Sequence, residues 1–404
     1  MLGCILNFFL MSGLKIKFIL FLIFVSPFCY SQNDSISVQS QDILDVIQKI
    51  FKKNDTINER RDRKLAFSLL PVPVGANNSN GLVISFLTTF YLGEDHETTN
   101  MSQVSFSPYF SFSNQYVFPI QSYIYTKDNK WNFIGDYRYL IYPQLTYGLG
   151  DNNSKEEMST LDYKQWRFYQ FITRKVVGNY RLGMGFLYDN YTNISEESYI
   201  DEETDYVKYM NGDFSDETSF GFAIQGLYDS RKNIVNPEGG MYIEADLRIN
   251  TSGVNGDKWQ SLYFDARKYH SFSKTKHRVW ASRAFYWSTF GGKPHYLDLP
   301  SIGWDRDGKT GRGFTKNRYR SNALIYFETE YRTDITRNGF FGAVFFANIS
   351  SVSKLDTYQF DKWHPAVGTG VRIKWNKKNN SNLALDYGIS KNDWSLRLGL
   401  TENF

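Results

Sequence analysis

Runs in which apolar and polar side chains alternate dominate the chain from Leu65 to the C-terminus. In residues 241–249, apolar side chains hold every odd position, and Tyr, Glu, Asp and Arg hold the even ones. The same period returns in residues 262–267, 323–332 and 341–349. Because the side chains of a β-strand alternate between two faces, each run predicts a strand with one apolar and one polar face.

Each run is about ten residues long, which is the length that a tilted strand needs to cross a membrane. The pattern predicts an all-β fold, a transmembrane antiparallel β-barrel of about sixteen strands. Fourteen also fits, because sequence alone defines strand ends poorly. The strands are expected near residues 65–75, 82–92, 101–112, 115–126, 131–141, 163–174, 178–189, 217–228, 240–250, 259–271, 275–289, 321–332, 339–349, 365–376, 380–389 and 393–404.

The connections between these runs alternate in length. Outer-membrane barrels have short periplasmic turns and long outer loops, so an even strand number places both termini in the periplasm of a Gram-negative cell. Short turns are expected at 127–130, 175–178, 273–276 and 376–381, and long loops at 142–162, 190–216, 290–320 and 350–364.

The composition agrees with a membrane barrel. Aromatic residues make up 18% of the 404 residues, with 29 Tyr and 33 Phe. Aromatic girdles of a barrel explain this excess, whereas soluble cores use mainly Leu, Val and Ala. The net charge is only +4 and no basic run occurs, so nucleic acid is not expected as a partner.

Residues 1–31 are expected to be a signal peptide. Two lysines precede the apolar run 18–25, which is too short to span a bilayer, and cleavage is expected after Ser31. Translation could start at Met1 or at Met11. No later segment has about 18 consecutive apolar residues, so the sequence excludes membrane-spanning helices.

Both cysteines, Cys4 and Cys29, lie in this leader. The alternative of a lipoprotein signal with Cys29 as the lipidated residue is disfavoured, because Phe28 stands where a small residue is needed. After cleavage the chain would contain no cysteine and could form neither a disulfide nor a thiolate metal site. We expect no cofactor.

Residues 32–64 are polar and lead into the barrel at 65–404. Within them, residues 42–52 place their apolar side chains at helical spacing, which predicts a short periplasmic helix or a plug for the periplasmic mouth. A partly ordered leader fits equally well.

The last predicted strand ends on an aromatic residue. Leu396, Leu398, Leu400 and Phe404 keep the two-residue period, and only Glu402 interrupts it. This ending resembles the C-terminal targeting signal that the barrel-assembly machinery reads during insertion.

A turn motif follows the strand predicted at 217–228. Asp229 and Arg231 precede Asn236 and Pro237, which start a turn, and Gly240, which permits a positive φ.

A second motif, Gly311-Arg312-Gly313-Phe314, lies in the longest late loop, and the strand pair 328–332 and 346–350 follows it. In this order, the three segments resemble the bacterial surface antigen family of BamA/TamA-type outer-membrane barrels, over about residues 65–404. Members carry an RGF or RGY signature on a loop that folds back into the lumen.

The resemblance implies that Arg312 lies in the lumen and pairs with Glu330. A buried charge requires acceptors, and Glu330 has the parity of a lumenal residue. The second family position, usually Asp, is Asn348, with Ser350 in place of a Gly. We therefore expect a single Arg312–Glu330 contact and not a two-carboxylate clamp. The alternative is that Arg312 is an exposed loop residue.

Family members that assemble or export proteins also carry periplasmic POTRA modules. Residues 32–64 are too few for such a domain, which needs more than about 40 residues. We expect a member without POTRA modules, so an insertase role does not follow from the fold. A separate periplasmic protein is a further expected partner, beside outer-membrane lipid, lipopolysaccharide and the barrel-assembly machinery.

No catalytic motif accompanies the five histidines, and no metal site is predicted, so we do not expect an enzyme. Acidic clusters at 202–205 and 156–157 could bind cations, although solvated loop charge is the simpler interpretation. The leading hypothesis is a role in outer-membrane assembly, in protein or lipid export, or in passage. A porin-like channel or substrate-specific transporter is the alternative, and a membrane-embedded lipid enzyme is a third.

Overall fold

The computed structural model describes residues 40–43, 45–46, 65–76, 79–92, 98–111, 114–273 and 277–404, with the backbone alone for residues 65–82. Residues 40–404 form one compact unit. The predicted signal peptide, residues 1–31, lies outside the described residues.

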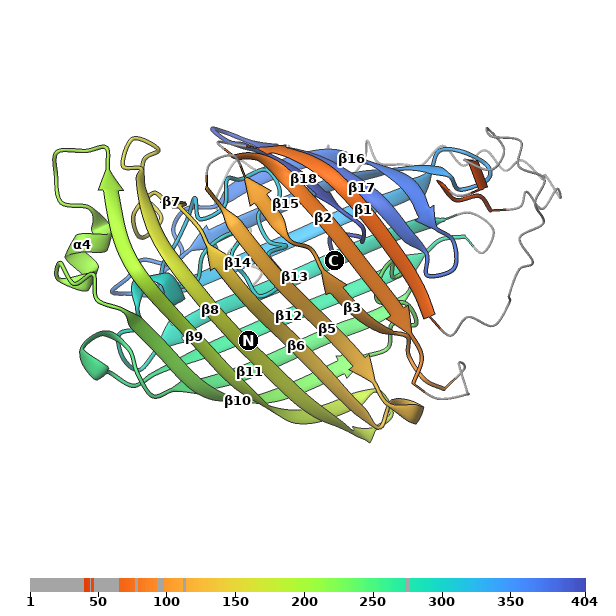
Figure 1. Ribbon diagram of the computed structural model, residues 1–404, viewed down its shortest axis with the longest axis horizontal. Helices are drawn as coiled ribbons and strands as arrows, with labels where there is room; N and C mark the ends of the chain where they lie inside the picture. The colour runs from red at the N-terminus through yellow and green to blue at the C-terminus, as the bar shows by residue number, and fades with distance from the viewer. Residues whose placement is uncertain are drawn as a thin grey trace, which may run out of the picture. The chain divides into compact units, whose positions relative to one another are not determined.

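The described chain is almost entirely β-strand (Figure 1). The short helical segments η1 (Lys127–Asn129), α4 (Asp205–Met210), η2 (Val254–Gly256) and η3 (Tyr296–Asp298) lie in connections. No described helix has both the length and the apolar character that a membrane span requires. The strands are β1 (Leu65–Ala76), β2 (Ser79–Phe90), β3 (Ser102–Phe106), β4 (Tyr109–Ser111), β5 (Tyr116–Tyr125), β6 (Trp131–Ile141), β7 (Gln144–Thr146), β8 (Ser159–Val177), β9 (Tyr180–Ser198), β10 (Glu217–Asp229), β11 (Gly240–Asn250), β12 (Trp259–Ser271), β13 (Arg278–Phe290), β14 (Ala323–Asp334), β15 (Phe341–Val352), β16 (His364–Asn376), β17 (Ser381–Ser390) and β18 (Trp394–Gly399).

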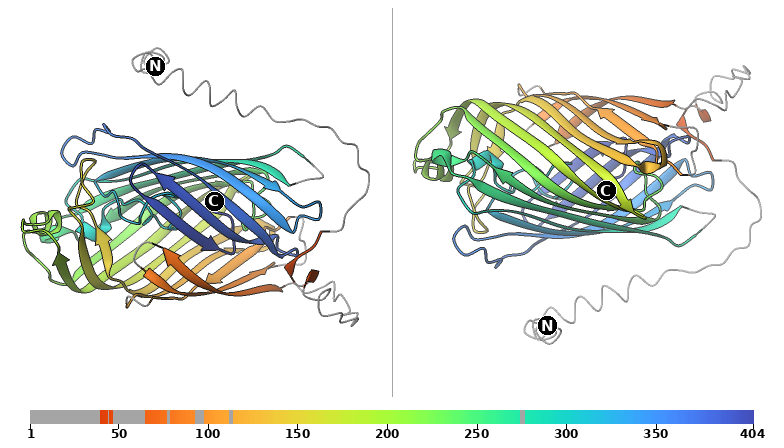
Figure 2. Two further views of the ribbon diagram at one scale, coloured as in Figure 1. Left: turned by 90° about the horizontal axis from the view of Figure 1, so that it is seen from above. Right: turned by 90° about the horizontal axis from the view of Figure 1, so that it is seen from below.

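These strands form one antiparallel sheet that closes into a barrel (Figures 1 and 2). Strands that follow each other along the chain pair in register from β8 to β18. β3 and β4 share one position between β2 and β5, and β6 and β7 share one against β8. The 18 segments therefore occupy 16 positions, and β18 lies beside β1. The predicted all-β barrel of about sixteen strands is confirmed.

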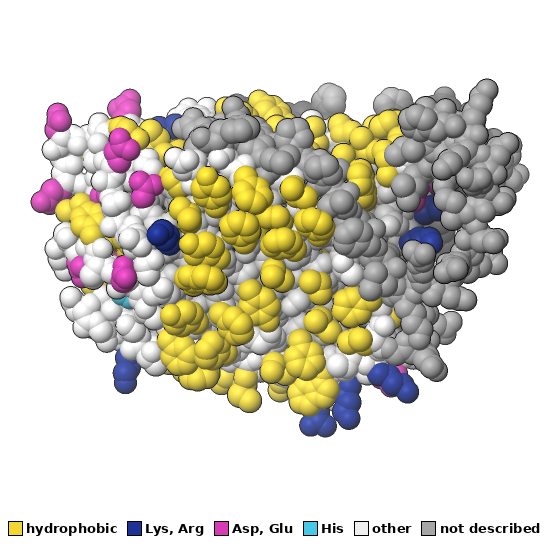
Figure 3. All heavy atoms as spheres, viewed as in Figure 1, with side chains coloured by type: hydrophobic (Ala, Val, Ile, Leu, Met, Phe, Trp, Pro, Cys, Tyr) yellow, Lys and Arg dark blue, Asp and Glu magenta, His cyan; other side chains and the backbone are white. Residues whose placement is uncertain are grey.

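The two faces of the strands have opposite polarity. In β11, the exposed Leu247 and Ile249 point outward, whereas the buried Glu244, Asp246 and Arg248 point into the lumen. On the face shown in Figure 3, apolar side chains gather over the middle, and charged side chains lie toward the two ends. A barrel that faces lipid has this arrangement, because apolar residues avoid water only if they point outward.

The structure differs from the sequence prediction at several strand ends. β8 and β9 each have 19 residues and extend into the regions predicted as loops 142–162 and 190–216. β8 and β9 stabilise each other beyond the predicted strand ends, because their pairing continues as far as Leu161 and Glu196 and on to Ser159 and Ser198. β18 ends at Gly399, so the predicted strand 393–404 is wrong in its last five residues.

The predicted helix at 42–52 lies mostly outside the described residues. Ile43, Asp45 and Val46 are helical, and the Val46 amide donates to the Asp42 carbonyl over 3.2 Å. Lys377, in the β16–β17 turn, pairs with Asp45 over 2.9 Å. The start of this segment thus lies against the short-turn end of the barrel.

Candidate functional site

The connection between β13 and β14, residues 291–322, is the longest in the described barrel, and we call it the lumenal loop. Residues 311–314 of this loop, with Arg312 at their centre, are all buried. They contact β14 to β18 of the wall; the Gly313 amide, for example, donates to Ser395 Oγ of β18 over 2.8 Å.

Arg312 is fully buried among three carboxylates. Its guanidinium donates to Glu328 and Glu330 of β14, and lies 3.0 Å from Asp386 of β17. The same group stacks on Phe346 of β15, 3.8 Å from the ring centre. Burial lowers the pKa of Arg312, but Glu328, Glu330 and Asp386 raise it by more, so it lies well above its usual range. Arg312 is therefore permanently charged and held by ion pairs.

The sequence prediction identified part of this arrangement. The structure brings Arg312 and Glu330 together, but the expectation that a clamp of two carboxylates could not form is wrong, because Glu328 and Asp386 also contact Arg312. Asn348 instead donates from Nδ2 to the Arg312 carbonyl over 2.8 Å. Glu328 could have been found, because it lies two residues before Glu330 and shares its face.

Glycines allow the motif to lie against the barrel wall. Gly311 and Gly313 have φ angles of +77° and +95°, which side chains other than glycine rarely adopt. A Cβ atom added at Gly313 would lie 2.7 Å from the Ala366 Cβ. The buried Phe314 packs with Ile302 and Ala366. The motif is therefore fixed by sterics as well as by charge.

A second group of ion pairs holds the lumenal loop to β11–β13, the neighbouring strands of the wall. Arg306 pairs with Glu244 and Asp246 of β11. Asp307 accepts from Arg267 of β12 over 2.7 Å. Arg283 of β13 lies 3.5 Å from Asp305. The loop is thus anchored to β11–β13 as well as to β14 and β17.

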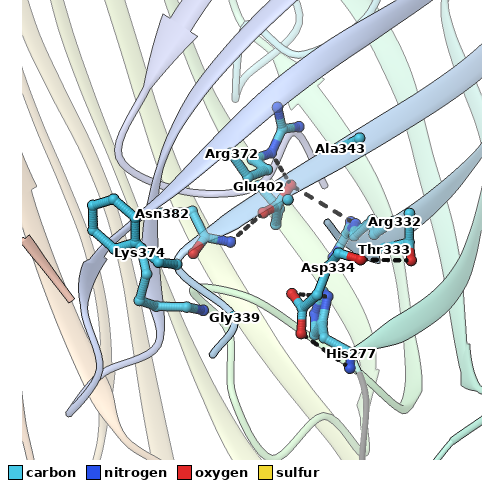
Figure 4. Close-up of a pocket in the computed structure, with 12 residues that line it drawn as sticks. His277, Arg332, Thr333, Asp334, Gly339, Ala343, Arg372, Lys374, Asn382 and Glu402 are labelled. Atoms are coloured by element: carbon cyan, nitrogen blue, oxygen red, sulfur yellow. Dashed lines mark hydrogen bonds and ion pairs between the residues drawn. The ribbon is translucent and has the colours of Figure 1, made fainter. Parts of the chain in front are cut away.

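The last five residues leave the sheet and enter the lumen (Figure 2). Glu402 accepts from Arg372 and from Asn382, both over 2.8 Å, and lies 3.8 Å from Arg332 (Figure 4). Burial raises the pKa of Glu402, whereas Arg372 and Arg332 lower it by more, to below its usual range. Glu402, which interrupts the strand pattern, is thus one of the residues that anchor this tail.

Phe404 is buried on the far wall of the barrel. It packs with Tyr269, Val279 and Ala281, and its carbonyl accepts from Arg332 over 2.6 Å. Leu400 is buried at the short-turn end, whereas Leu398 stays in β18 and is half-buried. The prediction that Phe404 ends the last strand is therefore wrong, because β18 ends at Gly399. The proposed targeting role of Leu398, Leu400 and Phe404 stays a prediction.

The tail and the lumenal loop also contact each other. Lys309 donates to the Glu402 carbonyl over 3.2 Å, and Asn403 donates to the Lys309 carbonyl over 3.2 Å. Asn403 further lies 3.4 Å from Glu328, which also binds Arg312. One connected network therefore joins the tail, the loop and the wall.

The turn motif lies at the mouth where the tail enters. Asp229 accepts from Arg231 over 3.0 Å, and the Asn236 side chain and the Pro237 carbonyl lie 3.5 and 3.1 Å from Arg332. Gly240 has a φ of +91°, and an added Cβ would lie 2.6 Å from a backbone carbonyl. The motif residues are thus brought together, with Arg332 linking them to the tail.

The charged side chains of this site are mostly engaged in ion pairs with one another. Among the described residues, no three His, Cys, Asp or Glu side chains are grouped so that they could hold a metal ion. His277 lies 3.7 Å from Glu238 at the short-turn mouth, and His295 lies 3.7 Å from Glu217 near the long loops. His96 lies outside the described residues.

We predict that Gly313→Ala lowers the free energy of unfolding by about 2–4 kcal/mol, from overpacking and from its positive φ. Gly308→Ala is the matched control, since its φ is +63° and the nearest atom to an added Cβ is 3.9 Å away. It should cost only about 1 kcal/mol. Urea unfolding, monitored by the heat-modifiable gel mobility of the folded barrel, measures the free energy of unfolding of both variants. Equal losses would show that the loop is not packed against Ala366.

We predict that Phe404→Ala lowers the stability of barrels refolded into lipid vesicles by about 3–5 kcal/mol, because it empties a buried pocket. No assembly machinery is present in this experiment, so a pure targeting role would leave stability unchanged. Phe404→Leu should retain most of the stability. Unchanged urea midpoints for both variants would contradict the lumenal position of Phe404.

Comparison with solved structures places the fold among outer-membrane barrels. The chain is similar to BamA from Haemophilus ducreyi lacking POTRA domains 1–3, with a TM-score of 0.51, 14% identity and coverage of 83% of this chain and 70% of that one. It is equally similar to CdiB from Acinetobacter baumannii, with a TM-score of 0.51, 11% identity and coverage of 83% and 59%. No protein-family model and no curated protein sequence matches it. At these identities the likeness shows the barrel fold.

Proposed function

We propose that this chain is an outer-membrane barrel related to the bacterial surface antigen family, with its lumen closed by the lumenal loop and the C-terminal tail. The proposed role is in assembly, export or passage at the outer membrane. This role requires displacement of the loop and the tail from the lumen, and it involves no covalent chemistry. The BamA-like and CdiB-like fold supports the proposal. The order of the sequence motifs around Arg312 supports it as well.

One observation carries the proposal, namely the ion-pair cluster at Arg312. The guanidinium comes from a loop, and its partners come from β14 and β17 of the wall. Removing one partner of such a buried pair typically costs about 3–5 kcal/mol, because the remaining charge is left without compensation. The closed arrangement is therefore the resting one, and a cargo or partner that opens it must replace these contacts.

The two ends and the outer surface suggest the partners. The apolar outer surface fits outer-membrane lipid, and the long-loop end would lie among lipopolysaccharide. The short-turn end, with residues 40–46 and the 230–239 connection, would face the periplasm. A separate periplasmic protein would act there, and the barrel-assembly machinery would act during insertion.

Planar-bilayer recording tests the closure directly. We expect the native barrel to show small or rare conductance steps and Arg312→Ala to show larger or more frequent ones, since it frees the loop from the wall. Arg318→Ala is the matched control, because Arg318 is a buried arginine of the same loop that pairs with no carboxylate among the described residues. It donates to Asn153 and lies over the rings of Tyr147 and Tyr319. It should leave the conductance unchanged.

Heat-modifiable mobility shows first whether each variant has folded. If Arg312→Ala reduces folding yield too far, Asp386→Asn provides a milder release of the same clamp. A large, steady conductance of the native barrel would indicate a general channel. No change in conductance or folding yield with Arg312→Ala would contradict the closure.

A further inference from the structure

One quarter of the barrel wall, four of its sixteen strand positions, carries no charge. Residues 65–92 and 98–126, which contain β1 to β5, include no Lys, Arg, Asp or Glu. Any charged group that faces this part of the wall from inside the lumen therefore finds no counter-charge on it. Elsewhere the lumenal faces of the strands are rich in ion pairs, as in β11–β14.

Lys316 of the lumenal loop lies close to the Thr310 carbonyl, because a Cβ built at Gly303 would lie 3.2 Å from Lys316 Cγ and 3.6 Å from that carbonyl. Its side chain is exposed and makes no hydrogen bond or ion pair with any described residue. Its nearest aromatic partner is Trp304, with Nζ 5.8 Å from the ring centre. Enclosure in the barrel lowers the pKa of Lys316 to about 8, and repulsion from Arg397 and Arg138 contributes further. Lys316 thus faces water inside the barrel and has cations as neighbours.

The two arginines bracket the neutral wall from β18 and β6. Arg397 donates to the carbonyls of Thr310 and Gly308 over 2.5 and 3.3 Å, and no described carboxylate lies within ion-pair distance of it. Arg138 donates to the Arg306 carbonyl and pairs with Asp136 over 2.7 Å. Of the three cations Lys316, Arg397 and Arg138, only Arg138 therefore forms an ion pair with a described carboxylate.

The nearby acidic residues of the lumenal loop are already neutralised. Asp307 pairs with Arg267 over 2.7 Å. Asp305 accepts from the Thr310 amide and hydroxyl, over 2.9 and 2.6 Å, and lies 3.5 Å from Arg283. Asp305 raises the pKa of Lys316, but by less than Arg397 or Arg138 lowers it, so positive charge prevails around Lys316.

From this arrangement we infer that Lys316, Arg397 and Arg138 form a binding site for small anions in a water-filled compartment of the lumen. A lysine supplies a compact charge on a flexible stem, and a guanidinium supplies paired N–H donors that suit phosphate and carboxylate oxygens. The site would therefore take inorganic phosphate or a carboxylate, and it would favour anions over cations entering the lumen.

The rate of thiol modification at a reporter cysteine tests whether the electrostatic potential beside Lys316 is positive. Gln121 of β5 faces this compartment, because its Nε2 lies 3.5 Å from the Arg306 carbonyl that Arg138 also binds. Gln121→Cys, in a Cys4→Ser/Cys29→Ser background, provides a single thiol. Its rates with a sulfonate-bearing and a trimethylammonium-bearing methanethiosulfonate are compared, each normalised to free cysteine. We expect the anionic reagent to be favoured.

Lys316→Gln should lower this preference for the anionic reagent about five-fold. This is the effect expected when one charge is removed about 8 Å from the thiol in water and the two reagents differ by two charges. Lys208→Gln, which removes an exposed charge of α4, is the control and should change nothing. Phosphate or acetate at constant ionic strength should slow the anionic reagent, and the more effective ion identifies the favoured class.

Three results would overturn the inference. They are a thiol that reacts with neither reagent, a ratio equal to that of free cysteine, and a ratio that Lys316→Gln leaves unchanged. A failure to see slowing by either phosphate or acetate would likewise contradict binding. None of these results bears on whether Arg312 holds the loop closed, which the bilayer experiment decides.

Discussion

Arg312 carries a permanent charge at a position that water does not reach, and the rest of the lumen is organised around that constraint. An uncompensated charge there would be prohibitively costly, so Glu328, Glu330 and Asp386 all point to the same place. They come from two strands that are far apart in sequence. The pairing of β15 and β16 between these two strands brings the carboxylates together, which couples the position of the loop to the integrity of this part of the wall.

The same carboxylates serve the rest of the interior. Asp386 pairs with Arg372 as well as with Arg312, and Arg372 pairs in turn with Glu402 of the tail. Arg332 joins Glu330 to the Phe404 carbonyl. Loop and tail are therefore not two independent plugs. A displacement of either one removes partners from the other, and opening the lumen is expected to involve both.

The fold could be predicted from sequence because its signal is local. The two-residue period of 241–249 needs no knowledge of distant residues, and the predicted strand 240–250 coincides with β11. The site could be predicted only in part. Glu330 has the right parity next to the motif, but Asp386 is 74 residues from Arg312, and no local pattern links them. The alternating pattern marks Glu402 as a break in the last strand, because the pattern assumes that the strand continues to the C-terminus. In the structure the strand has ended before Glu402, and this residue pairs with Arg372 in the lumen.

A double-mutant cycle between Arg312 and Asp386 tests the central claim most directly. Urea unfolding free energies are measured for the native barrel, Arg312→Ala, Asp386→Asn and the double variant. If the loop is held in the lumen by this contact, the two losses are not additive, and the coupling energy falls in the range of about 0.5–3 kcal/mol that is usual for residues in contact. Additivity within about 0.3 kcal/mol would mean that Arg312 does not reach Asp386 in the folded barrel, and it would contradict the account.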